Sequence, residues 1–409
     1  MGFPSREQTD TKLPCVKRMP TSVSALIYKV LLGLYVIFEH FDIHAFLSVE
    51  INMQSIRSIS KDYIMKTLML FLFYLQFLVL INKFVNKFCV RKNTHGLLRF
   101  PFIKRKNFNN VQIFAYHRVN NQRDPFFRGI SIDTFKKQIE YIAYRFNVLS
   151  LEDAVEQMRR EDVVDNAIVI TFDDGYRDVY LHAFPILKQF SIPATVFLPT
   201  AVIGSGQVLW HDRVFSAFRE TREPFLKEYG KNPKTYPMRI LHEKLLTLYE
   251  ILQFLRSLDG DERSFWIERL VDNLCVTDIK ETPNLMLTWD DVKHMHENGL
   301  YFGSHTVTHP ILSRTPCDEI RKELYESKNT IEENLCSPVR TFAYPVGRRE
   351  DFNDNVKNLL KEVGYICALT MIFGTNEPRQ DLFSLRRGQP WEEHLPTFAT
   401  KLHWYKLSS

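Results

Sequence analysis

Two adjacent carboxylates and two histidines are the residues of this chain best suited to chemistry. Asp173 and Asp174 end the run AIVITFDDG, and His305 and His309 stand four residues apart in GSHTVTHP. On a helical turn, side chains at i and i+4 share one face, so both imidazoles can reach one ion. Two histidines and one aspartate make a three-ligand site with open positions, which is typical of catalytic rather than structural metal sites. Two polar loop histidines without a metal are the alternative.

The apolar residues before the carboxylates predict a buried strand over 167–172. Isolated buried carboxylates are costly, so acids at such a strand end serve a cation or a reaction, unless they lie in solvent as an Asp-Asp-Gly turn. A third segment, RTFAYPVG, places a Pro-Gly turn at another strand end. That turn can point the backbone N–H of Tyr344 at a developing oxyanion, and Arg340 can hold a nearby carboxylate in its charged form.

Repeated β-then-α units from about residue 108 predict a parallel sheet, closed or open. The expected strands are 111–115, 167–172, 194–198, 300–303, 340–344 and 365–370. The expected helices are 150–158, 177–189, 288–299 and 318–335. Ser150 and Thr288 each stand three residues before an aspartate, a spacing that resembles a capping box. Between about residues 211 and 283 the chain is charged and helical without strand signals, which we interpret as an insertion.

The first hundred residues differ in kind from the rest. Residues 64–85 are almost continuously apolar and, at about 22 residues, long enough to span a bilayer of roughly 30 Å. A weaker apolar stretch, 23–38, is a second span, an in-plane helix or neither. We therefore divide the chain into a membrane-associating region with a basic linker, 1–107, and a catalytic domain, 108–409. The Lys and Arg residues that follow 64–85 favour a cytoplasmic catalytic domain.

The composition is that of an ordinary globular chain, with 409 residues, 45% hydrophobic and 25% charged, and a net charge of +5. No separate signature of nucleic-acid binding is present. The six cysteines are scattered, and none forms a CxxC pair. This pattern is typical of neither a disulfide framework nor a thiolate metal site.

The motifs TFDDG, SHTVTHP and RTFAYPVG, in this order, resemble those of the polysaccharide deacetylase family, the NodB-like carbohydrate esterases of family 4. YHRV and LWHDRVFSAF are similar to the branch that deacetylates the exopolysaccharide poly-N-acetylglucosamine. The similarity runs from about residue 111 to 390. It implies an α/β fold, a distorted (β/α) barrel with a helical insertion, and a site at the carboxyl ends of the strands.

The resemblance also implies roles. Asp174, His305 and His309 would bind a divalent metal, usually zinc, and Asp173 would be the general base. The metal would polarise an acetamide carbonyl and lower the pKa of a bound water to about 7, while the Tyr344 N–H would share the oxyanion. The expected substrate is an N-acetylated polysaccharide or glycan, and the products are acetate and a free amino sugar.

The proton donor for the leaving amine is harder to assign. The family often has a late Leu-x-His, which has no clean copy here, because neither His394 nor His403 fits the pattern. His117, at the end of the first strand, competes for the role. Arg387 resembles a family arginine that pairs near the base, and Arg386 is the neighbouring choice.

Trp210, His211 and Asp212 are candidates to line the substrate groove. Two other functions fit the same fold: a catalytically silent carbohydrate-binding barrel, and a hydrolase of another non-peptide C–N bond. Family members usually act outside the cytoplasmic membrane, contrary to the charge pattern. A glycan intermediate on the inner leaflet would reconcile the two, so the side of the membrane stays open.

Overall fold

The computed structural model describes residues 110–276 and 284–405. The predicted span 64–85, the weaker stretch 23–38 and the rest of the region 1–107 lie outside the described residues. Within the described ranges, no helix is both long enough and apolar enough to cross a membrane.

A parallel sheet positions everything that follows. Its strands run in the order β1-β3-β4-β7-β8-β9, and β2 pairs with β3. All these pairings are parallel, as the alternating pattern predicted. The bounds are β1 Gln112–Tyr116, β2 Asn147–Val148, β3 Ala167–Phe172, β4 Ala194–Leu198, β7 Tyr301–Ser304, β8 Thr341–Ala343 and β9 Cys367–Leu369.

A short segment near the C-terminus joins the two edges of this sheet. Parallel bridges pair Leu385 with Leu369 on β9, and Gly388 with Phe114 on β1. The amide of Leu385 donates to β9 at 3.0 Å, and that of Gly388 donates to β1 at 2.8 Å. The sheet therefore curls round and its edges are bridged, which fits the expected (β/α) barrel.

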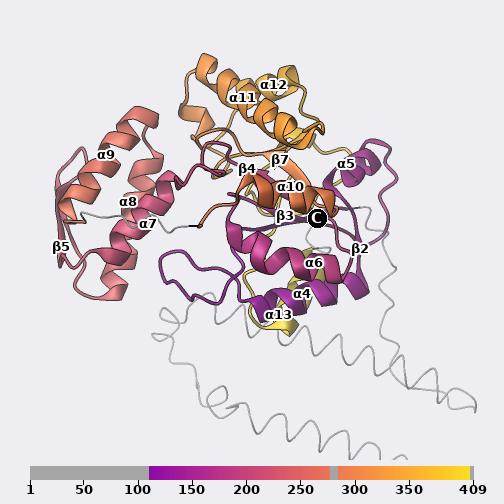
Figure 1. Cartoon of the computed structure of the whole chain (residues 1–409), viewed down its shortest axis with the longest axis horizontal. Coiled ribbons are helices and arrows are strands. Elements are labelled where there is room, and N and C mark those ends of the chain that lie inside the picture. The colour runs from indigo at the N-terminus through magenta and orange to yellow at the C-terminus, as the bar shows by residue number, and fades with distance from the viewer. Residues whose placement is uncertain (1–109, 277–283, 406–409) are drawn as a thin grey trace, which may run out of the picture. The chain divides into compact units, whose positions relative to one another are not determined.

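Helices surround the sheet, with α4 beside α13 and α11 beside α12 (Figure 1). Their bounds are α4 Ile132–Arg145, α5 Leu151–Arg159, α6 Phe184–Gln189, α10 Trp289–Glu297, α11 Cys317–Leu335, α12 Asp354–Val363 and α13 Leu395–Tyr405. The Ser150 hydroxyl caps α5, and Thr288 and Asp291 form the expected capping box of α10. The predicted helix 177–189 is divided into a π-helical turn, η2 (Val179–Ala183), and α6. Pro185 lacks an N–H, so regular hydrogen bonding cannot pass through this point.

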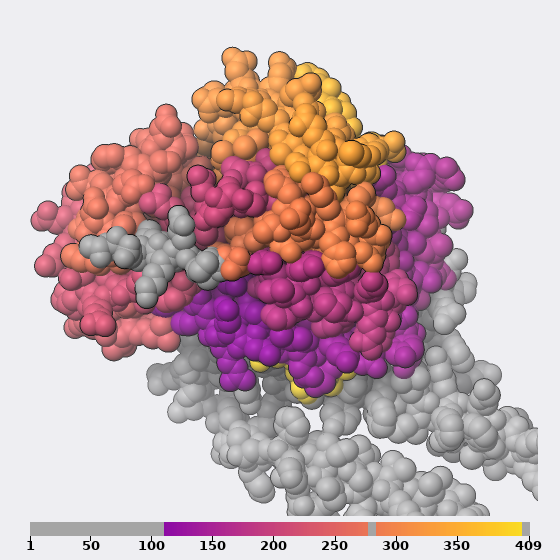
Figure 2. Space-filling view, viewed as in Figure 1, coloured from indigo at the N-terminus to yellow at the C-terminus, as the bar shows by residue number. Residues whose placement is uncertain are grey.

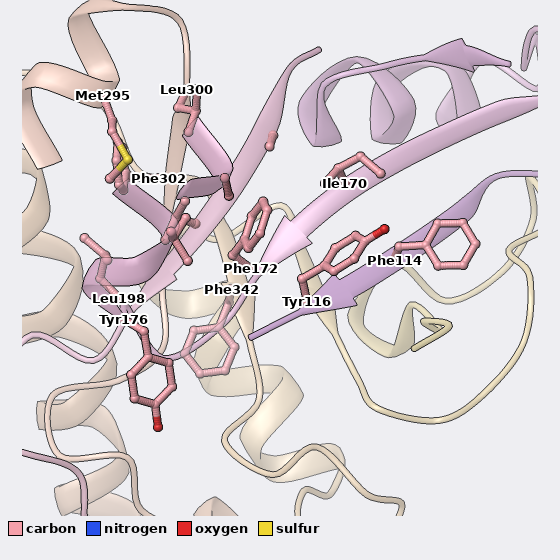
Figure 3. Close-up of a cluster of buried hydrophobic side chains, with 14 of the residues drawn as sticks. Phe114, Tyr116, Ile170, Phe172, Tyr176, Leu198, Met295, Leu300, Phe302 and Phe342 are labelled. Carbon is pink, nitrogen blue, oxygen red and sulfur yellow. The ribbon is translucent and has the colours of Figure 1, made fainter. Parts of the chain in front are cut away.

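Apolar side chains from neighbouring strands fill the core (Figure 3). The rings of Tyr116 on β1 and Phe172 on β3 stack with centroids 5.5 Å apart. Met295 and Leu300, before β7, belong to the same buried cluster. The strand that ends in the two carboxylates is therefore buried along its length, as its apolar sequence predicted.

The insertion forms a second packed region. It contains α7 (Trp210–Glu220), α8 (Leu241–Arg256), α9 (Gly260–Asn273) and the antiparallel strands β5 (Phe225–Tyr229) and β6 (Lys234–Pro237). Its helices share a separate cluster of buried side chains, among them Phe218, Ile251 and Leu270. Figure 2 shows its residues gathered on one side of the described surface. The prediction of helices is confirmed, but that of no strands is wrong: the β5–β6 register shifts between Leu226 and Tyr229, which removes the alternation that marks a strand.

Candidate active site

Asp174, His305 and His309 converge at the carboxyl ends of β3 and β7. The Nε2 atoms of His305 and His309 lie 3.5 Å and 3.4 Å from the same oxygen, Oδ1 of Asp174. One donor atom from each residue lies within 4.8 Å of the others, and all three residues are buried. A carboxylate and two imidazoles at this spacing fit a divalent metal ion, with room left for a substrate atom.

A hydrogen bond orients His305 as a metal ligand. Nδ1 of His305 lies 2.7 Å from the carbonyl oxygen of Ala343 on β8. Because a carbonyl only accepts, Nδ1 carries the proton and Nε2 keeps its lone pair toward Asp174. Nδ1 of His309 is buried and has no partner within the described residues.

The loop between the histidines is a bend, not the helical turn we expected. Thr306 and His309 have φ angles of 70° and 59°, in the left-handed region. Such strain costs about 1–3 kcal/mol per residue and persists only where the surroundings fix it. Here the Glu323 carboxylate on α11 accepts the amides of Val307 and Thr308 at 2.6 and 3.0 Å, and the Thr306 hydroxyl accepts the His309 amide at 3.0 Å.

The neighbouring carboxylate, Asp173, has a different partner. Both its oxygens accept hydrogen bonds from the Arg387 guanidinium, at 2.8 and 2.7 Å, and both side chains are buried. Arg387 Nε also donates to the Thr370 carbonyl at 2.9 Å. Burial alone would raise the pKa of Asp173, but the charges of Arg387 and His305 outweigh it and lower the pKa below its usual value. Asp173 is therefore ionised at neutral pH.

These groups face a cavity of about 340 Å³. Besides the two aspartates and the two histidines, its lining comprises His117, Phe127, Trp210, His211, Phe215, Arg256, Tyr344, Val346, Arg348, Met371 and Gln389. The structure thus brings His117, Trp210 and His211 to the cavity, as predicted. Nδ1 of His117 is buried without a hydrogen-bond partner in the described ranges.

Comparison with known proteins agrees with this geometry. Residues 160–222 and 247–368 match the model of the polysaccharide deacetylase family. The chain carries a polysaccharide deacetylase domain. The resemblance seen in the three motifs is thereby confirmed.

Two curated relatives of this domain are named poly-beta-1,6-N-acetyl-D-glucosamine N-deacetylase. The protein from Staphylococcus epidermidis is 32% identical over 112 residues, which cover 24% of this chain and 38% of that protein. The protein from Staphylococcus aureus is 25% identical over 136 residues, which cover 33% of this chain and 45% of that protein. The chain therefore spans less than half the length of the curated relatives it matches.

Solved structures with a similar course of the chain are more distant. IcaB from Ammonifex degensii is 17% identical, with 73% of this chain and 97% of that chain covered and a TM-score of 0.47. The Streptococcus pyogenes deacetylase PplD is 20% identical, with 68% and 92% covered and a TM-score of 0.46. Both scores are too low to support a further conclusion.

Two predicted residues of the deacetylase domain need correction. The backbone N–H of Tyr344 donates to Leu369 at 3.0 Å in the ladder between β8 and β9, so it is not free to meet an oxyanion. Arg340 precedes β8 and so lies at the amino end of that strand, away from the cavity. Its side chain is 54% exposed, and its nearest carboxylate is Glu152 at 4.0 Å.

The three residues at the start of α7 divide between two environments. Trp210 lies in the cavity wall, and its Nε1 donates to the His309 carbonyl at 3.2 Å. Asp212 does not line that cavity; its carboxylate accepts the Tyr176 hydroxyl at 2.9 Å, and the same hydroxyl lies 3.1 Å from His211 Nε2. Burial raises the pKa of Asp212 to about 7 and lowers that of His211 to about 3. Sequence reasoning missed Tyr176, although it directly follows TFDDG.

The other candidates lie elsewhere. His394 is exposed, and its Nδ1 is 3.2 Å from the Thr397 hydroxyl. The exposed Arg386 lines a larger surface cavity, of about 950 Å³, that includes none of the predicted metal ligands. Arg387, not Arg386, is therefore the arginine that reaches Asp173.

Proposed function

We propose that this chain is a metal-dependent N-deacetylase of an N-acetylated glycan, with zinc as the metal. The observation that carries the proposal is the meeting of Asp174, His305 and His309 beside the ionised Asp173 in one cavity. The names of the staphylococcal relatives support a poly-N-acetylglucosamine-like substrate. A binding module would have no use for a buried, charge-paired Asp173.

The two carboxylates have different tasks in this proposal. Asp174, with His305 and His309, would hold the metal, whose chemistry is to polarise the acetamide carbonyl and to ease ionisation of a water molecule. Asp173 accepts the proton of the attacking water. Each carboxylate oxygen has two lone pairs, so Asp173 keeps acceptor capacity while both its oxygens bind Arg387. The bidentate pair holds the base in one orientation.

A backbone amide other than that of Tyr344 is needed near the developing oxyanion. Val346 lines the cavity, and its φ of 60° turns the backbone after Pro345. No hydrogen bond of the Val346 N–H is found in the described part of the chain. We therefore assign the Val346 amide as the donor to the oxyanion.

The leaving amine requires a proton. His117 stands at the end of β1 in the cavity wall, and its Nδ1 has no hydrogen-bond partner within the described residues. His211 is the other histidine of the cavity outside the metal cluster, but burial keeps it neutral near pH 7. His117 is the proton donor in our proposal.

Membrane association through residues 64–85 is part of the proposal and rests on the sequence alone. A glycan substrate held at the membrane surface accords with it.

The test is acetate release by the full chain from poly-N-acetylglucosamine oligosaccharides, with and without a chelator. We expect release that stops on chelation and returns with zinc. Asp173→Asn should retain metal but lose turnover, whereas Asp165→Asn, at an exposed loop position, should be normal. Acetate release that is insensitive to the chelator excludes the metal-dependent mechanism. Normal turnover in Asp173→Asn excludes Asp173 as the general base.

A further inference from the structure

We propose that the glycan carries an oxyanion, a phosphate or a carboxylate, and that Arg256 and Arg348 bind it in the cavity wall. This inference rests on the proposed function and adds to it the chemical class of the substrate. Neither arginine belongs to the motifs that identify the domain. Arg256 comes from the insertion and Arg348 from the turn after β8.

Arg256 is the last residue of α8 and a cation without a counter-ion. Its Nε atom is buried and has no hydrogen-bond partner, and no carboxylate lies within ion-pair distance of it in the described ranges. Burial and the nearby charge of Arg348 lower the pKa of Arg256, and the carboxylate of Asp351, which forms no ion pair with it, opposes this shift only in part. An arginine is nevertheless protonated at all ordinary pH values, so the cavity contains this charge.

Arg348 adds a second charge at the same wall. Its Nη1 donates to the amide oxygen of Gln253 on α8 at 2.9 Å, which fixes the guanidinium against the insertion. Its nearest carboxylate, Glu350, is 3.9 Å away and largely exposed, so this pair contributes little. The buried carboxyl of Asp351 accepts the Arg348 backbone N–H at 2.8 Å and caps the turn rather than the guanidinium.

The charges of the cavity do not balance without a ligand. Arg387 neutralises Asp173. Asp174 offsets only one charge of a divalent metal. Arg256 and Arg348 add two more positive charges, of which the single carboxylate of Asp351 can offset at most one. Unpaired cations at a partly buried wall are costly, and a neutral N-acetylated sugar has no group to pair with them. A guanidinium binds phosphate and carboxylate oxygens through two parallel hydrogen bonds. An anionic group on the substrate would also offset the positive amine that deacetylation produces.

Another arginine of the insertion, Arg263, has a different position. Its guanidinium carbon lies 5.0 Å from the ring centroid of Trp210, so it packs behind the aromatic wall. It does not line the cavity. The anion site is therefore confined to Arg256 and Arg348.

The experiment compares three ligands on the zinc-supplied full chain. They are tri-N-acetylglucosamine, the same trisaccharide bearing a phosphate ester, and a tetrasaccharide in which N-acetylglucosamine alternates with glucuronic acid. We expect kcat/KM for acetate release to be about tenfold higher with an anionic ligand than with the neutral one. The phosphate and carboxylate arms show which oxyanion is preferred.

Variants separate recognition from structure. Arg256→Gln should lower kcat/KM for the anionic ligand about tenfold more than for the neutral one. Arg222→Gln, at an exposed position after α7, should behave as wild type. Equal kcat/KM for neutral and anionic ligands, or an equal loss for all ligands in Arg256→Gln, overturns the inference.

Calorimetric binding to Asp173→Asn gives a readout without turnover. Tighter binding of an anionic ligand than of the neutral one supports the inference. Equal Kd values overturn it, even if wild type releases acetate. No acetate from wild type, together with tighter anionic binding, rejects the proposed function and retains the anion site.

Discussion

The rim of the barrel, by which we mean the residues at the carboxyl ends of its strands, and the helical insertion both line one cavity. They contribute different chemical groups to it. On the barrel, Asp173 binds Arg387, and His305 binds the carbonyl of Ala343. On the insertion, Arg256 forms no ion pair within the described residues, and Trp210 presents an aromatic wall. The proposed base and one proposed metal ligand are thus held in place before substrate arrives, whereas the insertion presents a positive charge to the substrate.

The comparison predicts that damage to the rim abolishes the reaction. His305→Ala removes one of three metal donors, so bound metal should be lost and kcat/KM should fall at least about a thousandfold. Elemental analysis and acetate release measure the two effects. His394→Ala, at an exposed position outside the cavity, is the matched control and should keep both. Unchanged metal content in His305→Ala would refute the site.

Loss of the partner of the base should have a smaller effect with a distinct pH signature. In wild type the pKa of Asp173 lies below 3.8, so the ion pair adds stability above about pH 4 that is lost as the pH falls through the folded-state pKa. Arg387→Met removes the largest contribution that opposes burial, so that pKa rises. We expect kcat/KM to fall about a hundredfold and the acid limb of its pH profile to move to higher pH.

The neighbouring arginine provides the control for this prediction. Arg386→Met, at an exposed position, should leave the profile in place. Circular dichroism of both variants excludes unfolding as the cause of lost activity. An acid limb at the same pH in Arg387→Met would show that Arg387 does not set the protonation of Asp173.

Damage to the core of the insertion should affect stability more than chemistry. Ile251 is fully buried in the cluster of α8 and α9. Ile251→Ala should lower the free energy of unfolding by about 2–5 kcal/mol, while metal content stays at the wild-type level. Leu246→Ala, on the same helix with 54% of the side chain exposed, should change it by less than about 0.5 kcal/mol. Denaturant titration measures both, and loss of metal in Ile251→Ala would contradict the separation of the two regions.

The sequence predicted the rim better than the insertion, for a physical reason. Parallel strands bring their carboxyl ends to one edge, so residues that follow β3 and β7 must be close, however far apart they are in the chain. Asp174, His305 and His309 could therefore be placed together from two motifs. Arg387 could be placed as well, although only by resemblance, because the closing segment has no strand pattern of its own.

Other features depend on register and packing, which no motif encodes. The N–H of Tyr344 is already bonded in the β8–β9 ladder, so we propose the amide of Val346, which has no hydrogen bond within the described residues, in its place. Arg340 was predicted as a site residue, but it precedes β8 and so lies at the amino end of that strand, whereas the cavity lies at the carboxyl ends. Arg256 is the last residue of a helix, where a solvated side chain is the ordinary expectation for an arginine.

The segment that joins β9 to β1 both completes the sheet and supplies the arginine that pairs with the proposed base, Asp173. Leu385 and Gly388 bridge the two edge strands, and Arg387 between them reaches Asp173. A chain that stops short of this segment still contains Asp174, His305 and His309, yet its base lacks a counter-ion. During synthesis the metal ligands therefore leave the ribosome before the residue that makes Asp173 competent.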